Sequence, residues 1–128
     1  MSMVLEHRGV EANAAIEVKQ YEVWFADLGN RNGHEQRGHR PVLIISNDKG
    51  NKYSPVVIVT PISGQITKAK LPTHAVVKSS NTSVGRDSVM MFEQITTLDK
   101  SQLAYKLFDL PVSYRSEVRR GIMSSFNL

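Results

Sequence analysis

Short apolar stretches separated by polar turns dominate the chain, and most of them have the character of β-strands. Residues 21–26 alternate aromatic and β-branched side chains with a period of two. Two later stretches, PVLIIS at 41–46 and PVVIVTPIS at 55–63, are continuously apolar and predict strands buried on both faces. The second of these strands is expected to fray at Pro61. Two further strands are predicted at 73–78 and 88–97.

The segments between the predicted strands are polar and rich in turn-forming residues. Residues 47–53 (NDKGNKY) are typical of a turn. Residues 29–39 contain three glycines and no aliphatic side chain, and polar loops of this length are more often functional than idle. Because most successive strands have no helix between them, the pattern favours an antiparallel sheet over βαβ units.

Helix signals are confined to the last third of the chain. Asp99 can cap a short turn that runs through Leu103. Pro111 opens a longer helix, in which Gly121 costs about 1 kcal/mol relative to alanine and makes tertiary support necessary. Apolar side chains recur in this helix at four-residue steps, at Tyr114, Val118, Ile122 and Phe126. Together the elements predict a mainly β fold with α (α+β): a small, strongly bent antiparallel barrel of five or six strands with a C-terminal helix.

Length and composition fit one small globular domain. The chain has 128 residues, of which 41% are hydrophobic and 22% charged. Residues 1–17 show no clean period and are expected to form a loose N-terminal extension to a single domain at 18–128. The absence of cysteine excludes disulfides, thiol catalysis and Cys-based metal sites. No apolar run approaches the roughly 20 residues of a membrane span, and the N-terminus lacks a signal-peptide pattern, so we expect a cytoplasmic protein.

Charge is distributed unevenly along the chain. The formal net charge is +4, but nine basic and two acidic residues fall between Arg31 and Arg86, which gives that stretch +7 and the remainder −3. Such asymmetry favours a polyanionic partner, with phosphate the obvious candidate. A solvated basic face without a ligand accounts for the charge equally well.

One candidate site remains after the standard motifs are excluded. The glycines at 29, 33 and 38 do not match a phosphate-binding loop, and no G-x-S-x-G, H-E-x-x-H or EF-hand spacing is present. His34 and His39 are a weak metal signal. Arg40 lies where the polar loop meets a buried strand, and a rigid element there could fix a catalytic cation. The structural alternative for Arg40 is an ion pair with Glu35.

Several sequence blocks resemble the MazF/PemK family of toxin endoribonucleases. These blocks fall between about residues 20 and 108 and read WFADLG, EQRGHRPVLIISND, PVVIVTPIS, LPTHAVV and RDSVMMFEQITTLDK. The resemblance implies an SH3-like barrel, a homodimer and a cognate acidic antitoxin similar to MazE. It also implies sequence-specific cleavage of single-stranded RNA (mRNA) without metal or cofactor, which leaves 2′,3′-cyclic phosphate and 5′-hydroxyl ends and inhibits translation and growth.

The resemblance further implies roles for individual residues. Arg40 occupies the position of the family's catalytic arginine, and Ser63 that of its catalytic threonine or serine. Glu35 and Glu93 are alternative general bases, with His34 behind them. A set of polar residues is expected to bind the substrate: His34, Gln36, Arg86, Ser88 and Gln94.

Two positions depart from the family pattern, and two other functions stay open. His34 replaces a small residue and could alter base recognition, whereas Tyr21 replaces a glycine and is expected to affect only the beginning of the barrel. Trp24 and Phe25 are expected in the core rather than as base-stacking platforms. The alternative functions are a non-enzymatic toxin resembling CcdB, which would poison DNA gyrase, and an RNA-binding barrel that does not cleave.

Overall fold

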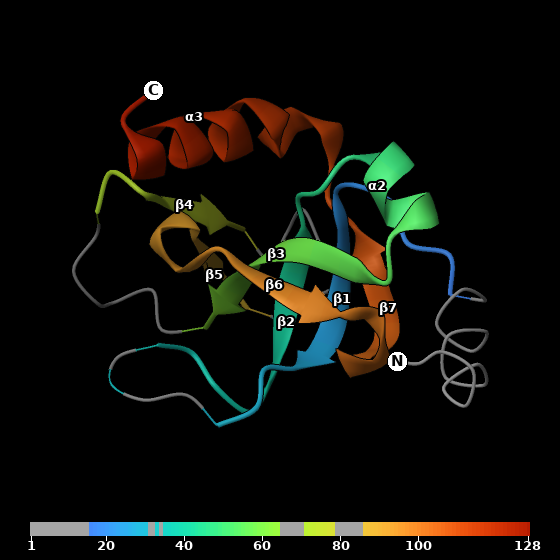
Figure 1. Ribbon diagram of the computed structural model, residues 1–128. Helices are drawn as coiled ribbons and strands as arrows, with labels where there is room; N and C mark the ends of the chain where they lie inside the picture. Colours follow the sequence, from blue (N-terminus) through green and yellow to red (C-terminus); the bar gives the residue numbers. More distant parts are fainter. Residues whose placement is uncertain (1–15, 31–32, 34, 65–70, 79–85) are drawn as a thin grey trace, which may run out of the picture.

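A bent antiparallel sheet forms the body of the molecule, and helix α3 lies along one side of it (Figure 1). The computed structural model describes residues 16–30, 33, 35–64, 71–78 and 86–128. The seven strands are β1 (Glu22–Asp27), β2 (His39–Ile44), β3 (Val56–Ser63), β4 (His74–Val77), β5 (Ser88–Met91), β6 (Thr96–Asp99) and β7 (Leu103–Asp109). The helical elements are α2 (Asp48–Tyr53), η2 (Phe92–Gln94), η3 (Lys100–Gln102), η4 (Val112–Tyr114) and α3 (Arg115–Phe126).

The strand order is β4-β5-β3-β2-β1-β7, and β6 pairs with β3 beside this path. Every pairing is antiparallel. Within the part of the chain that the structure describes, the end strands β4 and β7 do not pair with each other, so the sheet is bent but not closed. The predicted α+β fold with a C-terminal helix is confirmed, with seven strands in place of five or six.

Two hydrophobic clusters occupy the two faces of the sheet. The first cluster comprises Val18, Trp24, Ala26, Leu28, Val42, Ile44, Val57, Val59, Leu98 and Leu103. The second lies under α3 and comprises Val23, Leu43, Ile62, Ala75, Val77, Met90, Phe92, Leu110, Tyr114 and Val118. Successive side chains of a strand point to opposite faces, and the consecutive apolar residues of β2 therefore divide between the two clusters. This confirms the prediction that β2 is buried on both faces.

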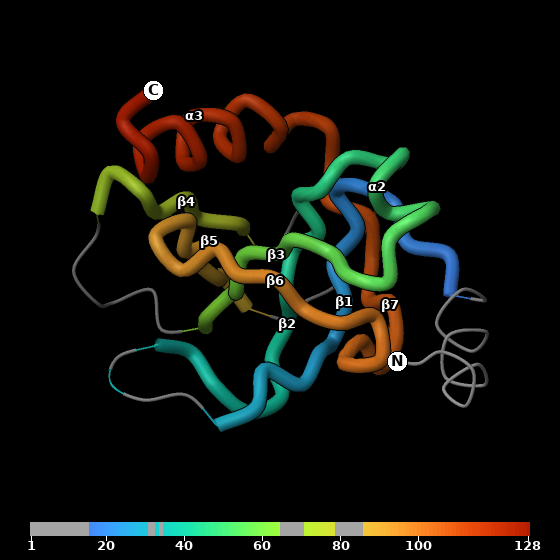
Figure 2. Tube along the Cα trace, in the orientation of Figure 1, coloured from blue at the N-terminus to red at the C-terminus, as the bar shows by residue number. Residues whose placement is uncertain are grey.

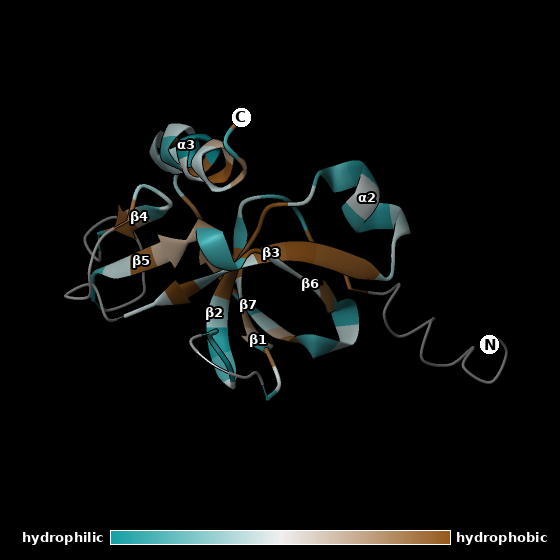
Figure 3. Cartoon of the chain, turned by 60° about the vertical axis from the view of Figure 1, so that its left-hand side comes forward, coloured by the Kyte–Doolittle hydropathy of each residue, from teal (hydrophilic) through white to brown (hydrophobic). Residues whose placement is uncertain are grey.

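Strand β3 runs through Pro61 without fraying, contrary to the sequence prediction. Residues 56–59 pair with β6 and residues 62–63 pair with β5, so Pro61 falls where the strand changes partner. Proline is tolerated at such an irregular position. The first half of β3 alternates, since Val56 and Ile58 are exposed. The prediction of burial on both faces is therefore wrong for that half, although its residues are all hydrophobic (Figure 3).

Three further local predictions need correction. The stretch expected to be a turn at 47–53 contains α2, because the Asn47 side chain accepts a bond from Gly50 N (2.8 Å) and caps the helix. The strand expected over 88–97 is interrupted by η2, which separates β5 from β6. Strand β7 was not expected, and its mostly exposed side chains explain why no apolar run marks it. The cap by Asp99 is confirmed at η3.

Helix α3 packs through the periodic positions that the sequence indicated, except the last one. Tyr114 and Val118 are buried, but Phe126 is 58% exposed. Each four-residue step exceeds the 3.6-residue turn, so the series drifts around the helix away from the buried face. A Cβ at Gly121 would collide with the ring of Phe92, so the missing side chain lets the helix approach the core closely. This contact is the tertiary support that the glycine was expected to need.

The residue before β1 is in contact with the first residue of α3. Tyr21 has a φ of 73°, in the left-handed region, and its ring lies under the guanidinium of Arg115 at 4.4 Å. Ile16 packs against the first cluster, and residues 1–15 lie outside the described residues. No helix of the described residues is long and apolar enough to cross a membrane.

Candidate functional site at the strand ends

Arg40 and Ser63 lie near facing ends of β2 and β3. In the register of these strands, Val42 is opposite Pro61 and Leu43 is opposite Thr60. Val42 and Pro61 are the last pair of this ladder, and Arg40 and Ser63 each lie two residues beyond it, so alternation puts Arg40 on the face of Val42 and Ser63 on the face of Pro61. Directly opposed residues of an antiparallel pair project to the same face. The two side chains that the resemblance singled out therefore belong to one face of the sheet.

The Arg40 side chain is half-buried and turns back toward the loop that precedes β2. Its Nε donates a hydrogen bond to the carbonyl of Arg37 (3.0 Å). In β1 its neighbour across the strand pair is the buried Ala26. Among the described residues, no ion pair joins Arg40 to Glu35, so the structural alternative for this arginine is not observed. Strand β2 begins at His39, on the side of the molecule away from α3 (Figure 2).

A second guanidinium lies beside Ser63. A Cβ added to Gly64 would stand 2.6 Å from Arg86 Nε and 2.8 Å from its Cζ, so the Arg86 side chain covers the backbone directly after Ser63. Ser63 is buried and Arg86 is exposed. The hydroxyl of Ser88, also buried, donates to the Arg86 carbonyl (3.3 Å). No role for Gly64 was predicted from the sequence. Its position directly after the predicted strand at 55–63 could have indicated one.

Glu35, Gln36 and Gln94 meet at a small cavity beside Pro61. The cavity has a volume of about 60 Å³. Gln36 N donates to Gln94 Oε1 (2.8 Å), which ties the β1–β2 loop to η2. Gln36 Oε1 is buried and has no partner among the described residues. A buried oxygen of this kind costs free energy unless water or a ligand supplies a donor. The exposed Glu35 carboxylate also forms no bond to another described residue.

Glu93 does not line this cavity, although it directly precedes Gln94. Its Oε1 accepts from Thr73 Oγ1 (2.9 Å), and its Oε2 pairs with His74 Nε2 (2.9 Å). Side chains one residue apart in a turn of three residues diverge by about 120°. Arg120 of α3 extends this cluster through bonds to the carbonyls of Pro72 and His74.

The candidate residues therefore form two groups. We call the first the strand-end cluster: Glu35, Gln36, Arg40, Ser63, Arg86 and Gln94. The second is the β4–α3 corner: Thr73, His74, Glu93, Arg120 and Glu117, whose Oε1 pairs with Arg120 Nη2 (2.9 Å). His34 lies outside the described residues. No group of three or more potential metal-ligating side chains occurs in the described ranges.

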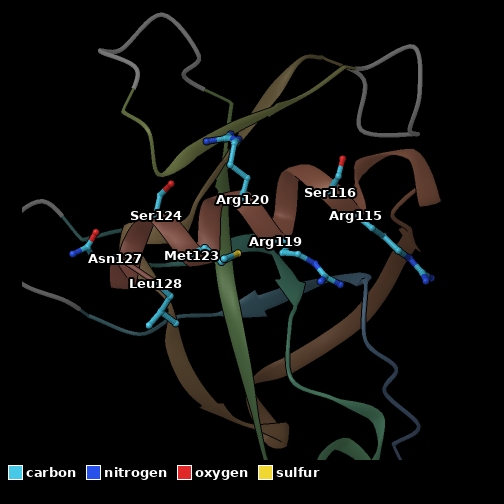
Figure 4. A pocket seen from close by; sticks show the side chains of 8 residues that line it. All are labelled: Arg115, Ser116, Arg119, Arg120, Met123, Ser124, Asn127 and Leu128. Atoms are coloured by element: carbon cyan, nitrogen blue, oxygen red, sulfur yellow. The ribbon is translucent and has the colours of Figure 1, made fainter.

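A further hollow is separate from the strand-end cluster and shares only Arg120 with the β4–α3 corner. It has a volume of about 720 Å³ and lies on the outer side of α3, where Arg115, Arg119 and Met123 line it (Figure 4). None of the predicted catalytic or substrate-binding residues contributes to it.

Comparison with known proteins identifies the family. A family model of PemK-like, MazF-like toxins of type II toxin–antitoxin systems matches residues 19–126. The chain belongs to this family. A curated relative, endoribonuclease MazF of Staphylococcus saprophyticus, is 48% identical over 111 residues, which cover 87% of this chain and 92% of the relative. With an endoribonuclease this similar, the alternative of a CcdB-like gyrase poison is not favoured.

Solved structures of more distant proteins share the fold. MazF of Deinococcus radiodurans matches with a TM-score of 0.73 and 23% identity, covering 88% of this chain and 99% of that one. A mycobacterial endoribonuclease in complex with its cognate antitoxin matches with a TM-score of 0.72 and 21% identity, covering 87% and 96%. These likenesses support the bent sheet with its terminal helix.

Proposed function

We propose that this protein is the toxin of a type II toxin–antitoxin system and acts as a sequence-specific endoribonuclease on single-stranded RNA. Family membership and the 48% identical endoribonuclease support the activity. The observation that supports the site assignment is the β2–β3 register, in which Arg40 and Ser63 each lie two residues beyond the last pair, Val42–Pro61. The basic stretch from Arg31 to Arg86 supports a polyanionic substrate.

In the proposed reaction the substrate's own 2′-hydroxyl attacks the adjacent phosphorus. A bond forms between the 2′ oxygen and phosphorus, and the bond from phosphorus to the 5′ oxygen breaks. The products are a 2′,3′-cyclic phosphate and a 5′-hydroxyl. The chain must hold the RNA backbone in line, offset negative charge on the phosphoryl oxygens, accept the 2′ proton and allow a proton to reach the leaving 5′ oxygen.

Side chains near the adjacent ends of β2 and β3 would stabilise the negative charge on the phosphoryl oxygens. The planar guanidinium of Arg40 can donate to two phosphoryl oxygens at once. The Ser63 hydroxyl adds a neutral donor, and Arg86 over Gly64 adds a second positive charge close by. Removal of one such donor typically lowers the rate about 100- to 1000-fold.

Between the two carboxylates left open as general bases, the surroundings favour Glu35. The Glu35 carboxylate is exposed beside the cavity that Gln36 and Gln94 line. The oxygens of Glu93 are instead engaged by Thr73 and His74. We assign proton abstraction to Glu35, and substrate binding to Gln36, Ser88, Gln94 and the undescribed His34.

An antitoxin partner follows from the family. Deinococcus radiodurans MazF is known in MazE–MazF complexes, and the mycobacterial relative in complex with its cognate antitoxin. For this chain we propose an acidic, MazE-like segment that competes with RNA for the basic surface, a homodimer, and a cytoplasmic location.

The decisive experiment compares Arg40→Ala with wild type on a long single-stranded RNA in EDTA. Wild type should give discrete fragments with cyclic-phosphate ends, and Arg40→Ala should lose at least about 100-fold in rate with an unchanged melting temperature. Arg119→Ala, which removes an exposed arginine of α3, is the matched control and should cut normally. Cleavage by Arg40→Ala at the wild-type rate would overturn the assignment. Sequencing the fragment ends would define the recognised sequence.

A further inference from the structure

Three aromatic rings form a continuous row across β2, β1 and β7. The rings of Phe25 and His39 have centroids 5.8 Å apart and planes inclined by 24°. Phe25 and Tyr105 are 5.4 Å apart and inclined by 25°. Phe25 is the central ring and stacks on both neighbours. The row therefore extends from the first residue of β2 to the edge strand β7.

The outer rings of the row are open to solvent. Tyr105 is 55% exposed, His39 is exposed and Phe25 is half-buried. The neighbouring Trp24 differs, since it is buried in the first cluster and its Nε1 donates to Glu22 (2.9 Å). The expectation of a core position is thus confirmed for Trp24, whereas Phe25 belongs to a surface row. Cross-strand aromatic pairs stabilise a sheet, but that role does not require the end rings to be exposed.

The row adjoins the proposed catalytic arginine. His39 and Arg40 are consecutive, so their Cα atoms are about 3.8 Å apart. Their side chains leave β2 on opposite faces, and both belong to the first two residues of the strand, at one end of the sheet. The bond from Arg40 Nε to the Arg37 carbonyl turns the guanidinium toward that end. An RNA strand with a phosphate at Arg40 could therefore pass over the sheet end onto the rings.

The charges around the row are mixed, with the arginines at the His39 end. Arg37 and Arg40 supply positive charge at one end. Asp27, which is opposite His39, is engaged by its own loop, where its Oδ1 accepts from Gly29 N (2.8 Å). Lys106, next to Tyr105, forms ion pairs with Glu22 and Asp109.

We propose that the His39–Phe25–Tyr105 row is a stacking surface for a base that flanks the cleaved bond of single-stranded RNA. The inference rests on the proposed function and adds a subsite to it. Every base has a π-face, so such a surface contributes affinity with little sequence preference. The row would hold the strand in place while other groups read the sequence.

The test is a kinetic cycle between one ring and one base. Wild type, Tyr105→Leu and Tyr105→Phe are compared on RNAs of one sequence, each with a single abasic nucleotide at a successive position around the cleaved bond. Base–aromatic stacking is worth about 1–3 kcal/mol, so Tyr105→Leu should raise KM for intact RNA about 5- to 150-fold with little change in kcat. Tyr105→Phe should behave as wild type. For the RNA that lacks the base at the stacked position, wild type and Tyr105→Leu should have the same KM.

The possible outcomes separate the subsite from the activity. If wild type cuts no RNA, the proposed function fails and the subsite with it. If wild type cuts and Tyr105→Leu matches its KM on every RNA, the subsite alone is wrong. The subsite is also wrong if Tyr105→Leu raises KM equally on all abasic RNAs. It is wrong too if the substitution changes only the melting temperature, or only the oligomeric state measured by size-exclusion chromatography.

Discussion

Glu35 and Glu93 carry the same functional group, yet their surroundings differ in kind. Glu93 belongs to the β4–α3 corner, where Thr73 and His74 engage its two oxygens. Glu35 belongs to the strand-end cluster, where its carboxylate has no bond to another described residue. The corner is a network that links β4, η2 and α3, since Arg120 also bonds to the His74 carbonyl (2.8 Å).

The contrast extends from these carboxylates to the regions around them. The corner satisfies its polar groups internally, and such networks stabilise and orient the elements that carry them. The strand-end cluster leaves Gln36 Oε1 buried without a partner in the described chain and the Arg40 guanidinium turned toward the loop. Groups that make no bond to another described residue, such as the Glu35 carboxylate and Gln36 Oε1, can bond to a substrate without breaking a bond to another described residue. The difference predicts that changes in the first region affect stability and changes in the second affect catalysis.

The largest expected effect comes from exchanging each glutamate for its amide. Glu35→Gln should lower kcat about 100- to 10,000-fold, because the amide cannot accept the 2′ proton, with little change in the melting temperature. Glu93→Gln should keep most of the rate and lose stability, because an amide accepts from only one of Thr73 and His74 with its oxygen. Single-turnover cleavage and thermal unfolding of both variants check the pair.

A reversed pattern would refute the division of roles. If Glu93→Gln removed cleavage at an unchanged melting temperature, Glu93 would be the base and the corner a part of the active site. Glu93→Asp is a useful control, because it keeps the charge but shortens the reach to His74.

A change to the helix next to the corner should have an intermediate effect. Gly121→Ala places a Cβ against the Phe92 ring and should destabilise the fold by about 1–3 kcal/mol, as overpacking of a core does. Ser124→Ala, on the exposed side of the same helix, should be nearly neutral. Urea unfolding measures both variants, and the cleavage rate of the folded fraction should not change.

Equal stability of Gly121→Ala and Ser124→Ala would show that α3 can move away from η2 without cost. The close packing of this helix would then not support the corner.

The smallest expected effect concerns a third carboxylate, Glu22, which is buried but paired. Lys106 contacts Glu22 (3.2 Å) and Asp109 (2.9 Å), and the hydrogen bond with Asp109, followed by Glu22, raises the lysine's pKa above 10.5 against the opposing effect of burial. A raised pKa contributes stability below about pH 10.5 that is lost as pH climbs through the folded-state value. Lys106→Met should therefore cost about 1 kcal/mol or less at pH 7.

The difference between wild type and Lys106→Met should shrink above pH 10.5, where wild type loses the lysine charge. Unfolding free energies at pH 7 and pH 11 provide the comparison. A difference that stays constant with pH would assign the effect to packing of the lysine stem rather than to its charge.

The sequence predicted those elements whose own side chains determine them. The continuous apolar run of β2 and the four-residue period of α3 both depend on burial, and the structure confirms both. Strand β7 was missed because pairing with β1, rather than hydrophobicity, makes it a strand. The helix at Asp48–Tyr53 was missed because the capping side chain of Asn47 is equally typical of a turn.

The candidate site shows the same limit. Arg40 and Ser63 could be proposed because the sequence blocks around them match those of the family, so their assignment did not depend on the packing of the chain. The divergence of Glu93 from Gln94 could not, since it depends on whether that segment continues as a strand or turns into η2. The cover of Arg86 over Gly64 depends on packing between residues distant in sequence, which no local pattern reveals.

The left-handed backbone of Tyr21 makes the C-terminal helix relevant to the first strand. A residue other than glycine adopts this conformation at a cost of about 1–3 kcal/mol, which the surrounding structure must offset. Here the amide of Tyr21 donates to Ile44, its carbonyl accepts from Leu110, and Arg115 covers its ring. Loss of α3 would remove that cover and leave the residue with its conformational cost. Shortening the chain from its far end would therefore loosen β1, and with it the neighbouring strand that carries Arg40.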